Sequence, residues 1–154
     1  MWGPSGWSHR LPGLILALLG AAIAAYLAAF QVGLVSSVWD PIFDGGSRRV
    51  LTSSIAELLP VPDAALGLAA YLAEAVLLLL GGTDRWRRRP WLVFLNAAVA
   101  AGLGLAALAL IGLQAWVVGA WCSLCLTSAT TSLLIGAFSV PETLAALRGT
   151  PTGP

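Results

Sequence analysis

Four long apolar segments constrain this chain more than any other feature of its sequence. They cover residues 11–35, 62–80, 91–113 and 117–140. About 20 apolar residues cross the hydrocarbon core of a bilayer, so each segment is long enough to span it. Of the 154 residues, 58% are hydrophobic and only 10% are charged, whereas a soluble domain carries about 25% charged residues. We therefore predict an all-α, multi-pass membrane protein. Its single transmembrane domain (1–154) is expected to be an antiparallel up-down four-helix bundle surrounded by membrane lipid.

The arginines predict how this bundle is oriented. All eight basic residues are arginine, and four of them lie between Arg85 and Arg89, just after the second apolar segment. The positive-inside rule places that loop in the cytoplasm. With four spans in the cytoplasmic membrane, both termini are then cytoplasmic, and the loop at 36–61 lies outside. Eight arginines against seven acidic residues leave no basic surface for a nucleic acid, so no nucleic-acid partner is expected.

The outer loop at 36–61 is predicted to contain a helix of its own. Trp39 and Phe43 have the character of interfacial anchors. From Ser47, a plausible N-cap, apolar residues recur at helical spacing until Pro60. This pattern predicts an amphipathic helix lying on the bilayer surface, where it would cover the outer end of the bundle.

Small and polar residues inside the spans predict how the helices pack. Two stripes with four-residue spacing would allow close helix approach; they are Gly20, Ala24 and Ala28, and Ala98, Gly102 and Ala106. Counted from the cytoplasmic ends of their segments, Glu74 and Asn96 lie at a similar depth of about 10 Å, so we expect them to hydrogen-bond. An intramembrane carboxylate can serve in proton transfer, but the distance of Glu74 from the cysteines favours a structural role.

The two cysteines, Cys122 and Cys125, are the candidate catalytic residues. Their three-residue spacing places both sulfurs on one face of a helix, close enough to bridge. A helix N-terminus favours the reactive thiolate, and we expect Cys122 in the first turns of the last segment. Cys122 could then meet a thiol from the aqueous side, and Cys125, about 4.5 Å deeper, a lipid-soluble electron acceptor. Two packing residues are the alternative. The only histidine is His9 in the N-terminal tail, so neither a metal nor a haem is expected.

Two stretches of the chain carry a resemblance to a known family. One is Trp121-Cys122-Ser123-Leu124-Cys125-Leu126, and the other runs from Ser47 to Tyr71, with Val50-Leu51-Thr52-Ser53 before Pro62 and Leu66-Gly67-Leu68-Ala69-Ala70-Tyr71 after it. Together they resemble the vitamin K epoxide reductase family, from the first helix to Ala129. The resemblance implies a four-helix membrane enzyme that binds a quinone with its head group against Cys125. It also implies that Ser53 is the loop-helix serine beside the active site.

The chain departs from this family in its outer loop. Members usually carry a second cysteine pair there, which relays electrons from a thioredoxin-like partner. Here Ser47 stands where the second loop cysteine is expected, and residues 36–43 contain no cysteine. A relay of thiols through the loop is therefore impossible. Either a partner exchanges disulfides directly with Cys122, or the partner brings the missing thiols, or the ordinary turnover has been lost.

These observations predict a quinone-dependent thiol–disulfide oxidoreductase. Electrons would pass from a thioredoxin-like dithiol protein on the outer face, through Cys122 and Cys125, to a quinone of the menaquinone or ubiquinone type as substrate. The residues expected to line the head-group pocket are Ser53, Tyr71, Gln114, Trp116 and Trp121. For each of them, and for the tryptophans above all, interfacial anchoring is the alternative. The alternative function is a non-catalytic membrane protein that assembles with or stabilises a partner, with the dithiol as a redox-sensitive staple.

Overall fold

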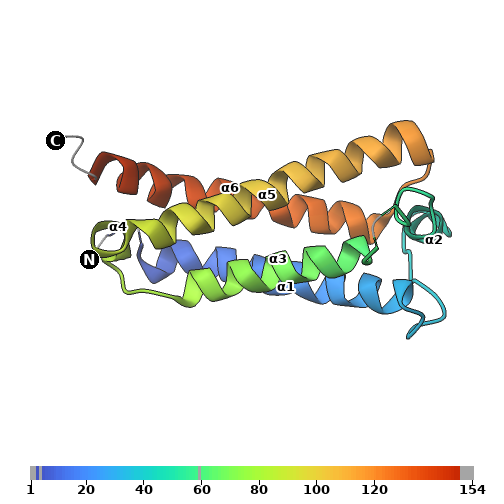
Figure 1. Cartoon of the computed structure of the whole chain (residues 1–154), viewed down its shortest axis with the longest axis horizontal. Helices are drawn as coiled ribbons and strands as arrows, with labels where there is room; N and C mark the ends of the chain where they lie inside the picture. The colour runs from blue at the N-terminus through green and yellow to red at the C-terminus, as the bar shows by residue number, and fades with distance from the viewer. Residues whose placement is uncertain (1–2, 4, 59, 150–154) are drawn as a thin grey trace.

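The computed structural model describes residues 3, 5–58 and 60–149, which form helices and no strand. Four helices of 17 to 27 residues lie side by side (Figure 1); they are α1 (Trp7–Gln31), α3 (Asp63–Leu79), α5 (Pro90–Leu113) and α6 (Ser123–Gly149). Short elements connect them, namely α2 (Gly46–Leu51), α4 (Arg85–Arg88) and the π-helical turn η1 (Gln114–Val118). Three helices, α1, α5 with η1, and α6, are long and apolar enough to cross a membrane. The prediction of an all-helical membrane protein is confirmed.

Close contacts between small residues hold the long helices together. Helix α1 packs against α3 and α6, and α5 packs against α6 and α3. The predicted stripe at Gly20, Ala24 and Ala28 is buried. At Gly20, a β-carbon would overlap the ring of Tyr71, so glycine is what allows α1 to lie this close to α3. The second stripe behaves differently: Ala98, Gly102 and Ala106 are exposed, and α5 instead buries Ala100, Leu103 and Ala107.

The boundaries of the first and last helices differ from the predicted segments. Helix α1 covers 7–31 where 11–35 was expected, and the last helix covers 123–149 where 117–140 was expected. The later start of the last helix has a local cause. Residues 114–118 continue α5 as a π-helical turn, which Gly119 ends in the left-handed conformation with φ at 63°. Glycine adopts this conformation without a steric penalty, so the chain can turn there towards α6.

The helix in the outer loop is shorter than predicted. Helix α2 begins at Gly46, after Gly45 in the left-handed conformation, and ends at Leu51. The hydroxyl of Thr52 donates to the carbonyl of Arg48 at 2.8 Å, and that of Ser53 donates to the carbonyl of Val50 at 2.7 Å. Such side-chain bonds compete with the helical ones, which explains the early end. Part of the predicted helix, at Leu59, lies outside the described residues.

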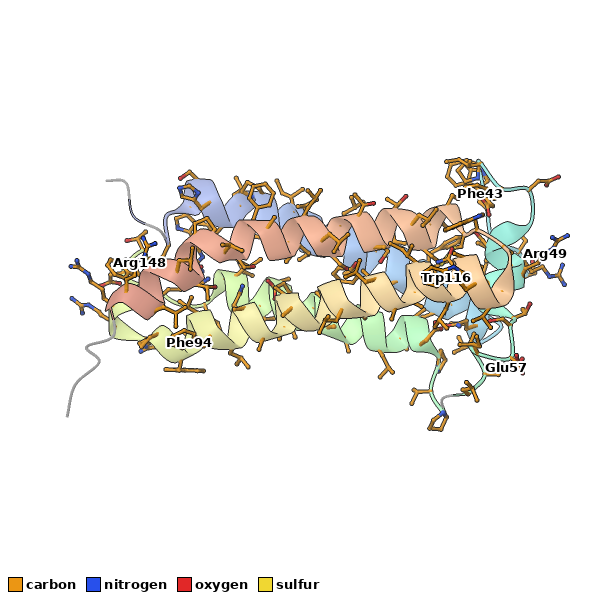
Figure 2. The ribbon with its side chains drawn as sticks, turned by 90° about the horizontal axis from the view of Figure 1, so that it is seen from above. Phe43, Arg49, Glu57, Phe94, Trp116 and Arg148 are labelled. Carbon is orange, nitrogen blue, oxygen red and sulfur yellow. A yellow bond between two sulfur atoms is a disulfide. The ribbon has the colours of Figure 1, made fainter. Side chains whose placement is uncertain are left out.

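The molecule has two distinct ends. Helix α2 lies at one of them, and α4 lies at the other together with the start of α1 and the end of α6 (Figure 1). Figure 2 places Arg148 at the α4 end, opposite the labelled residues of the α2 end, Phe43, Arg49, Glu57 and Trp116. Between the ends, the amide of Asn96 donates to the carboxylate of Glu74 at 3.0 Å, which confirms the predicted hydrogen bond.

Candidate active site

The two cysteines form a disulfide at the start of α6, with their Cα atoms 5.1 Å apart. The carbonyl of Cys122 accepts the N–H of Leu126 at 2.9 Å, the first bond of the helix, so Cys122 is the N-cap residue. Its sulfur accepts the backbone N–H of Cys125 at 3.0 Å. A thiolate at Cys122 would therefore be stabilised by an amide and by the helix dipole. The spacing predicted the bridged pair correctly, although Cys122 caps the helix instead of lying within its first turns.

Gln114 fixes the backbone of Cys122 from the end of α5. Its side chain is fully buried, and its carboxamide oxygen accepts the N–H of Cys122 at 2.9 Å. Its backbone carbonyl accepts the N–H of Gly119 at 3.0 Å, which closes the π-helical turn. Gln114 was expected to line the quinone pocket. In the structure its side chain lies next to the disulfide and binds the backbone of the first cysteine.

Helix α2 covers Cys122. The sulfur-bearing side chain of Cys122 is 0% exposed, and Val50 and Ala120 pack against it. A β-carbon at Gly46 would collide with the backbone carbonyl of Trp121, so α2 rests directly on the chain that enters α6. The expected access to Cys122 from the aqueous side is not seen in this conformation. A partner thiol can reach the sulfur only when the cover moves.

Hydrogen bonds to the carboxylate of Asp40 hold α2, the cover, over Cys122. One oxygen accepts the hydroxyl of Ser123 at 2.7 Å and the N–H of Phe43 at 3.0 Å. The other accepts the N–H and the hydroxyl of Ser47 at 2.8 and 2.7 Å. Burial raises the pKa of Asp40, but the hydrogen bonds from Ser123 and Ser47 outweigh it and hold that pKa well below its usual range. An ionised Asp40 thus connects the outer loop, the start of α2 and the start of α6.

Cys125 lies on the wall of an apolar cavity of about 470 Å³. This volume falls within the range of about 300–1,000 Å³ that is typical of small-molecule sites. Helices α1, α2, α3, α5 and α6 all contribute to the wall; the lining residues are Ala24, Leu27, Val50, Leu51, Asp63, Ala64, Leu66, Gly67, Ala70, Tyr71, Gly102, Leu103, Ala106, Ala109, Leu110, Cys125 and Ser128. Cys122 is not among them. The disulfide therefore presents its second sulfur-bearing residue to the cavity.

Two polar residues meet beside Cys125 in this wall. The hydroxyl of Tyr71 donates to the carbonyl of Ser128 at 2.7 Å, and it lies 2.8 Å from the hydroxyl of Ser128 and 2.6 Å from that of Ser132. Ser128 follows Cys125 by three residues and so shares its helix face.

Neither Ser128 nor Asp40 was expected at the site from the sequence. The three-residue spacing was a signal for Ser128, and the Asp-Pro turn before Gly45 was one for Asp40.

The five residues expected around a quinone head group do not gather at one site. All five are described in the structure, and of these five Tyr71 alone lines the cavity. Ser53 donates its hydroxyl to the carbonyl of Val50 in the outer loop. Trp116 is 87% exposed and Trp121 is 38% exposed. The structure therefore brings Tyr71 together with Cys125, and places the other candidates in or near the cover.

Comparison with known proteins identifies a family for this chain. The family model of the vitamin K epoxide reductase family matches residues 11–140, a range that contains both cysteines, the cover and the cavity. No curated protein matches the chain. The match extends over most of the 154 residues. This chain belongs to the vitamin K epoxide reductase family, and the family implies a membrane oxidoreductase.

Proposed function

We propose that this protein is a thiol–disulfide oxidoreductase that reduces a membrane quinone. One observation carries the proposal: Cys125, half of a disulfide, lines an apolar cavity large enough for a quinone head group. The other half, Cys122, lies under a cover at the same end of the molecule. Cys125 would thus face a lipid-soluble acceptor, and an external thiol would reach Cys122 when the cover moves.

The reaction balances in two stages. A thiolate of an external, thioredoxin-like dithiol protein attacks the sulfur of Cys122, and its second thiol then releases the partner as a disulfide. This leaves Cys122 and Cys125 as thiols. In the second stage the two thiols close to a disulfide again, and the quinone takes up two electrons and two protons to become a quinol. Hydroxyls of Tyr71 and Ser128 beside the cavity would stabilise charge that develops on the quinone oxygen.

We infer the orientation in the cytoplasmic membrane from the arginines at the α4 end. We place α1, α3, α5 and α6 as four spans; α3 has 17 residues, the lower limit for crossing, with a length of about 26 Å. Arg85 and Arg87–Arg89 put the α4 end in the cytoplasm with both termini. The disulfide then lies on the outer side, where thiols are readily oxidised, and α2 lies at the membrane interface.

Quinone reduction by the purified protein tests the proposal. With a dithiol as electron donor, wild type should reduce an added short-chain quinone, followed by its ultraviolet absorbance. Cys125→Ser should abolish this activity, because no disulfide can form. Thr130→Ala changes an exposed residue on the same helix and should retain it. Equal rates for wild type and Cys125→Ser would show that the cysteine pair does not reduce the quinone.

The burial of Cys122 under α2 supports one other function, a non-catalytic membrane protein stapled by its disulfide. The short bridge argues against it. A disulfide between residues three apart restricts the unfolded chain little, and the chain-entropy model gives it about 2 kcal/mol. If reduction unfolds the protein and no quinone is reduced, the disulfide is a staple. If the reduced protein stays folded and reduces quinone, it is a redox centre.

A further inference from the structure

Four charged side chains are buried between the middle of the bundle and its α4 end, away from the disulfide; they are those of Arg10, Glu74, Arg85 and Glu142. Two of them satisfy each other: the Nε and Nη2 atoms of Arg85 lie 2.5 and 2.6 Å from the two carboxylate oxygens of Glu142. The terminal nitrogens of Arg10 donate to backbone carbonyls, among them Leu80 at 2.9 Å and Gly81 at 3.1 Å. Arg10, which is positive, and Glu74, which is negative, therefore have no ion-pair partner in contact among the described residues.

Three buried atoms in this region have no hydrogen-bond partner among the described residues. They are Nε of Arg10, Oε2 of Glu74 and Oδ1 of Asn96. Their side chains are at most 2% exposed, and all three line one cavity of about 10 Å³. Leaving such atoms unpaired costs about 1–3 kcal/mol each. The set consists of one donor and two acceptors, which matches a water molecule that accepts one hydrogen bond and donates two. The cavity is at the lower limit for one water.

We propose that Arg10, Glu74 and Asn96 bind a buried water molecule, and that Glu74 takes up through it, from the α4 end, a proton that quinone reduction consumes. The water bridges Arg10 and Glu74, so two arginines balance two carboxylates in the cluster. The sequence favoured a structural role for Glu74 because of its distance from the cysteines. The shared cavity instead gives Glu74 a polar connection towards the end that carries both termini.

Polar side chains continue from Glu74 in both directions. Towards the α4 end, the cavity wall also includes His9 of α1, and Ser139 and Glu142 of α6. The charged or titratable groups around Glu74 are thus Arg10 and His9 on α1, Arg85 after α3, and Glu142 on α6; α5 contributes the neutral Asn96.

Towards the disulfide, Tyr71 precedes Glu74 by three residues on α3, which places both on the same helix face. The hydroxyl of Tyr71 hydrogen-bonds Ser132 and Ser128 at 2.6 and 2.8 Å. Ser128 lines the quinone cavity beside Cys125. On α6, Ser132 lies between Ser128 at this cavity and Ser139 at the small cavity beside Glu74, so hydroxyl groups follow the helix from one cavity towards the other.

This inference rests on the proposed function, because quinone reduction is what consumes the protons. An external dithiol passes its two hydrogens to Cys122 and Cys125. Closure of that pair to the disulfide then releases two protons at the disulfide end, while the quinone takes up two to form quinol. If uptake occurs through Glu74, those protons come from the α4 end. Each turnover then removes protons from one side of the membrane and releases protons on the other.

Proton uptake can be measured in sealed vesicles that contain the protein, a short-chain quinone and a pH-sensitive dye in the lumen. A membrane-impermeant phosphine added outside reduces only molecules with the disulfide outward, so the lumen faces the α4 end. Wild type should make the lumen alkaline as quinol forms. Glu74→Gln should lose this lumen signal and slow quinol formation at least tenfold, and Glu74→Asp should restore part of both. Glu57→Gln, the same change at an exposed glutamate, should behave as wild type.

The possible outcomes separate the proposed quinone reduction from proton uptake by Glu74. Quinol formation by wild type without an alkaline lumen overturns the inference and leaves the proposed function intact. An alkaline lumen that Glu74→Gln leaves unchanged makes Glu74 structural and also overturns the inference. If Glu74→Gln does not fold, the wild-type lumen signal and the Glu74→Asp rates decide. No quinol formation by wild type removes the proposed function and this inference with it.

Discussion

At the level of single residues, the carboxylate of Asp40 holds the cover over Cys122 without touching the cysteine itself. Asp40 accepts hydrogen bonds from Ser47, at the start of α2, and from Ser123, between the two cysteines. These partners are 7 and 83 residues away in the chain. The cysteine pair was evident from its own spacing. The role of Asp40 was not, because it depends on a contact between distant segments that no local pattern encodes.

Replacing Asp40 by asparagine should loosen the cover over Cys122. An amide nitrogen cannot accept the bonds that Ser47 or Ser123 donates, so at least one charge-assisted hydrogen bond is lost. The rate at which a water-soluble phosphine reduces the disulfide should rise about tenfold, the factor that corresponds to one such bond. Asp44→Asn, the same change at an exposed aspartate of the same loop, should leave the rate unchanged. Equal rates in both variants would show that Asp40 does not hold the cover.

The same carboxylate predicts an effect of pH. Hydrogen bonds keep the pKa of Asp40 lower in the folded protein than in the unfolded chain. Its contribution to stability is therefore complete above the unfolded pKa of about 4 and is lost as the pH falls through the folded value. The reduction rate of the disulfide by the phosphine should rise as the pH falls below about 4, relative to a small-molecule disulfide. In Asp40→Asn this rise should be absent.

At the scale of elements, the contact between α2 and the start of α6 shapes the site. The sequence predicted a helix in the outer loop and a last helix with both cysteines near its start, and both exist. Their lengths differ from the prediction for local reasons: Thr52 and Ser53 bond to backbone carbonyls and end α2. Gly119 separates the π-helical turn from α6. The cavity was not predictable, because exposed Gly102 and Ala106 line it while the helix contact uses other residues.

Gly46→Ala tests the contact between these elements. The added β-carbon would meet the backbone carbonyl of Trp121, which cannot rotate away, so α2 must move off the start of α6. Overpacking of this kind costs about 1–3 kcal/mol, and the thermal midpoint in detergent should fall. Gly136→Ala, in the middle of α6 with open space at its β-carbon, should raise the midpoint slightly because alanine favours a helix. A Gly46→Ala protein as stable as wild type would contradict the close approach.

At the scale of the whole molecule, the two ends have different chemistry. The disulfide lies at the α2 end with an apolar cavity beside Cys125, and the buried ion pair of Arg85 and Glu142 lies at the α4 end. The arginines after the second apolar segment were evident in the sequence, but the partner of Arg85 was not. Glu142 lies 57 residues further on, beyond residue 140, where the last apolar segment was expected to end. Only the packing of α4 against α6 brings the two together.

This ion pair predicts a large difference between two arginines of the same short helix. Arg85→Leu leaves Glu142 charged and buried without its partner, which costs about 3–5 kcal/mol. Arg88→Leu removes an exposed pair with Asp84, and such pairs contribute about 0–1 kcal/mol. Thermal unfolding in detergent should therefore separate the two variants clearly. Similar midpoints would mean that Arg85 and Glu142 are not a buried pair.

A single turnover shows whether the cysteine pair itself reduces the quinone. The protein is fully reduced, freed of reductant and mixed with an excess of a short-chain quinone, while quinol is followed by absorbance and the protein by intact mass. We expect one quinol per protein molecule, together with the loss of two hydrogens as the bridge between Cys122 and Cys125 re-forms. A quinone that stays oxidised, or quinol formed while both thiols remain, would rule out quinone reduction by this pair.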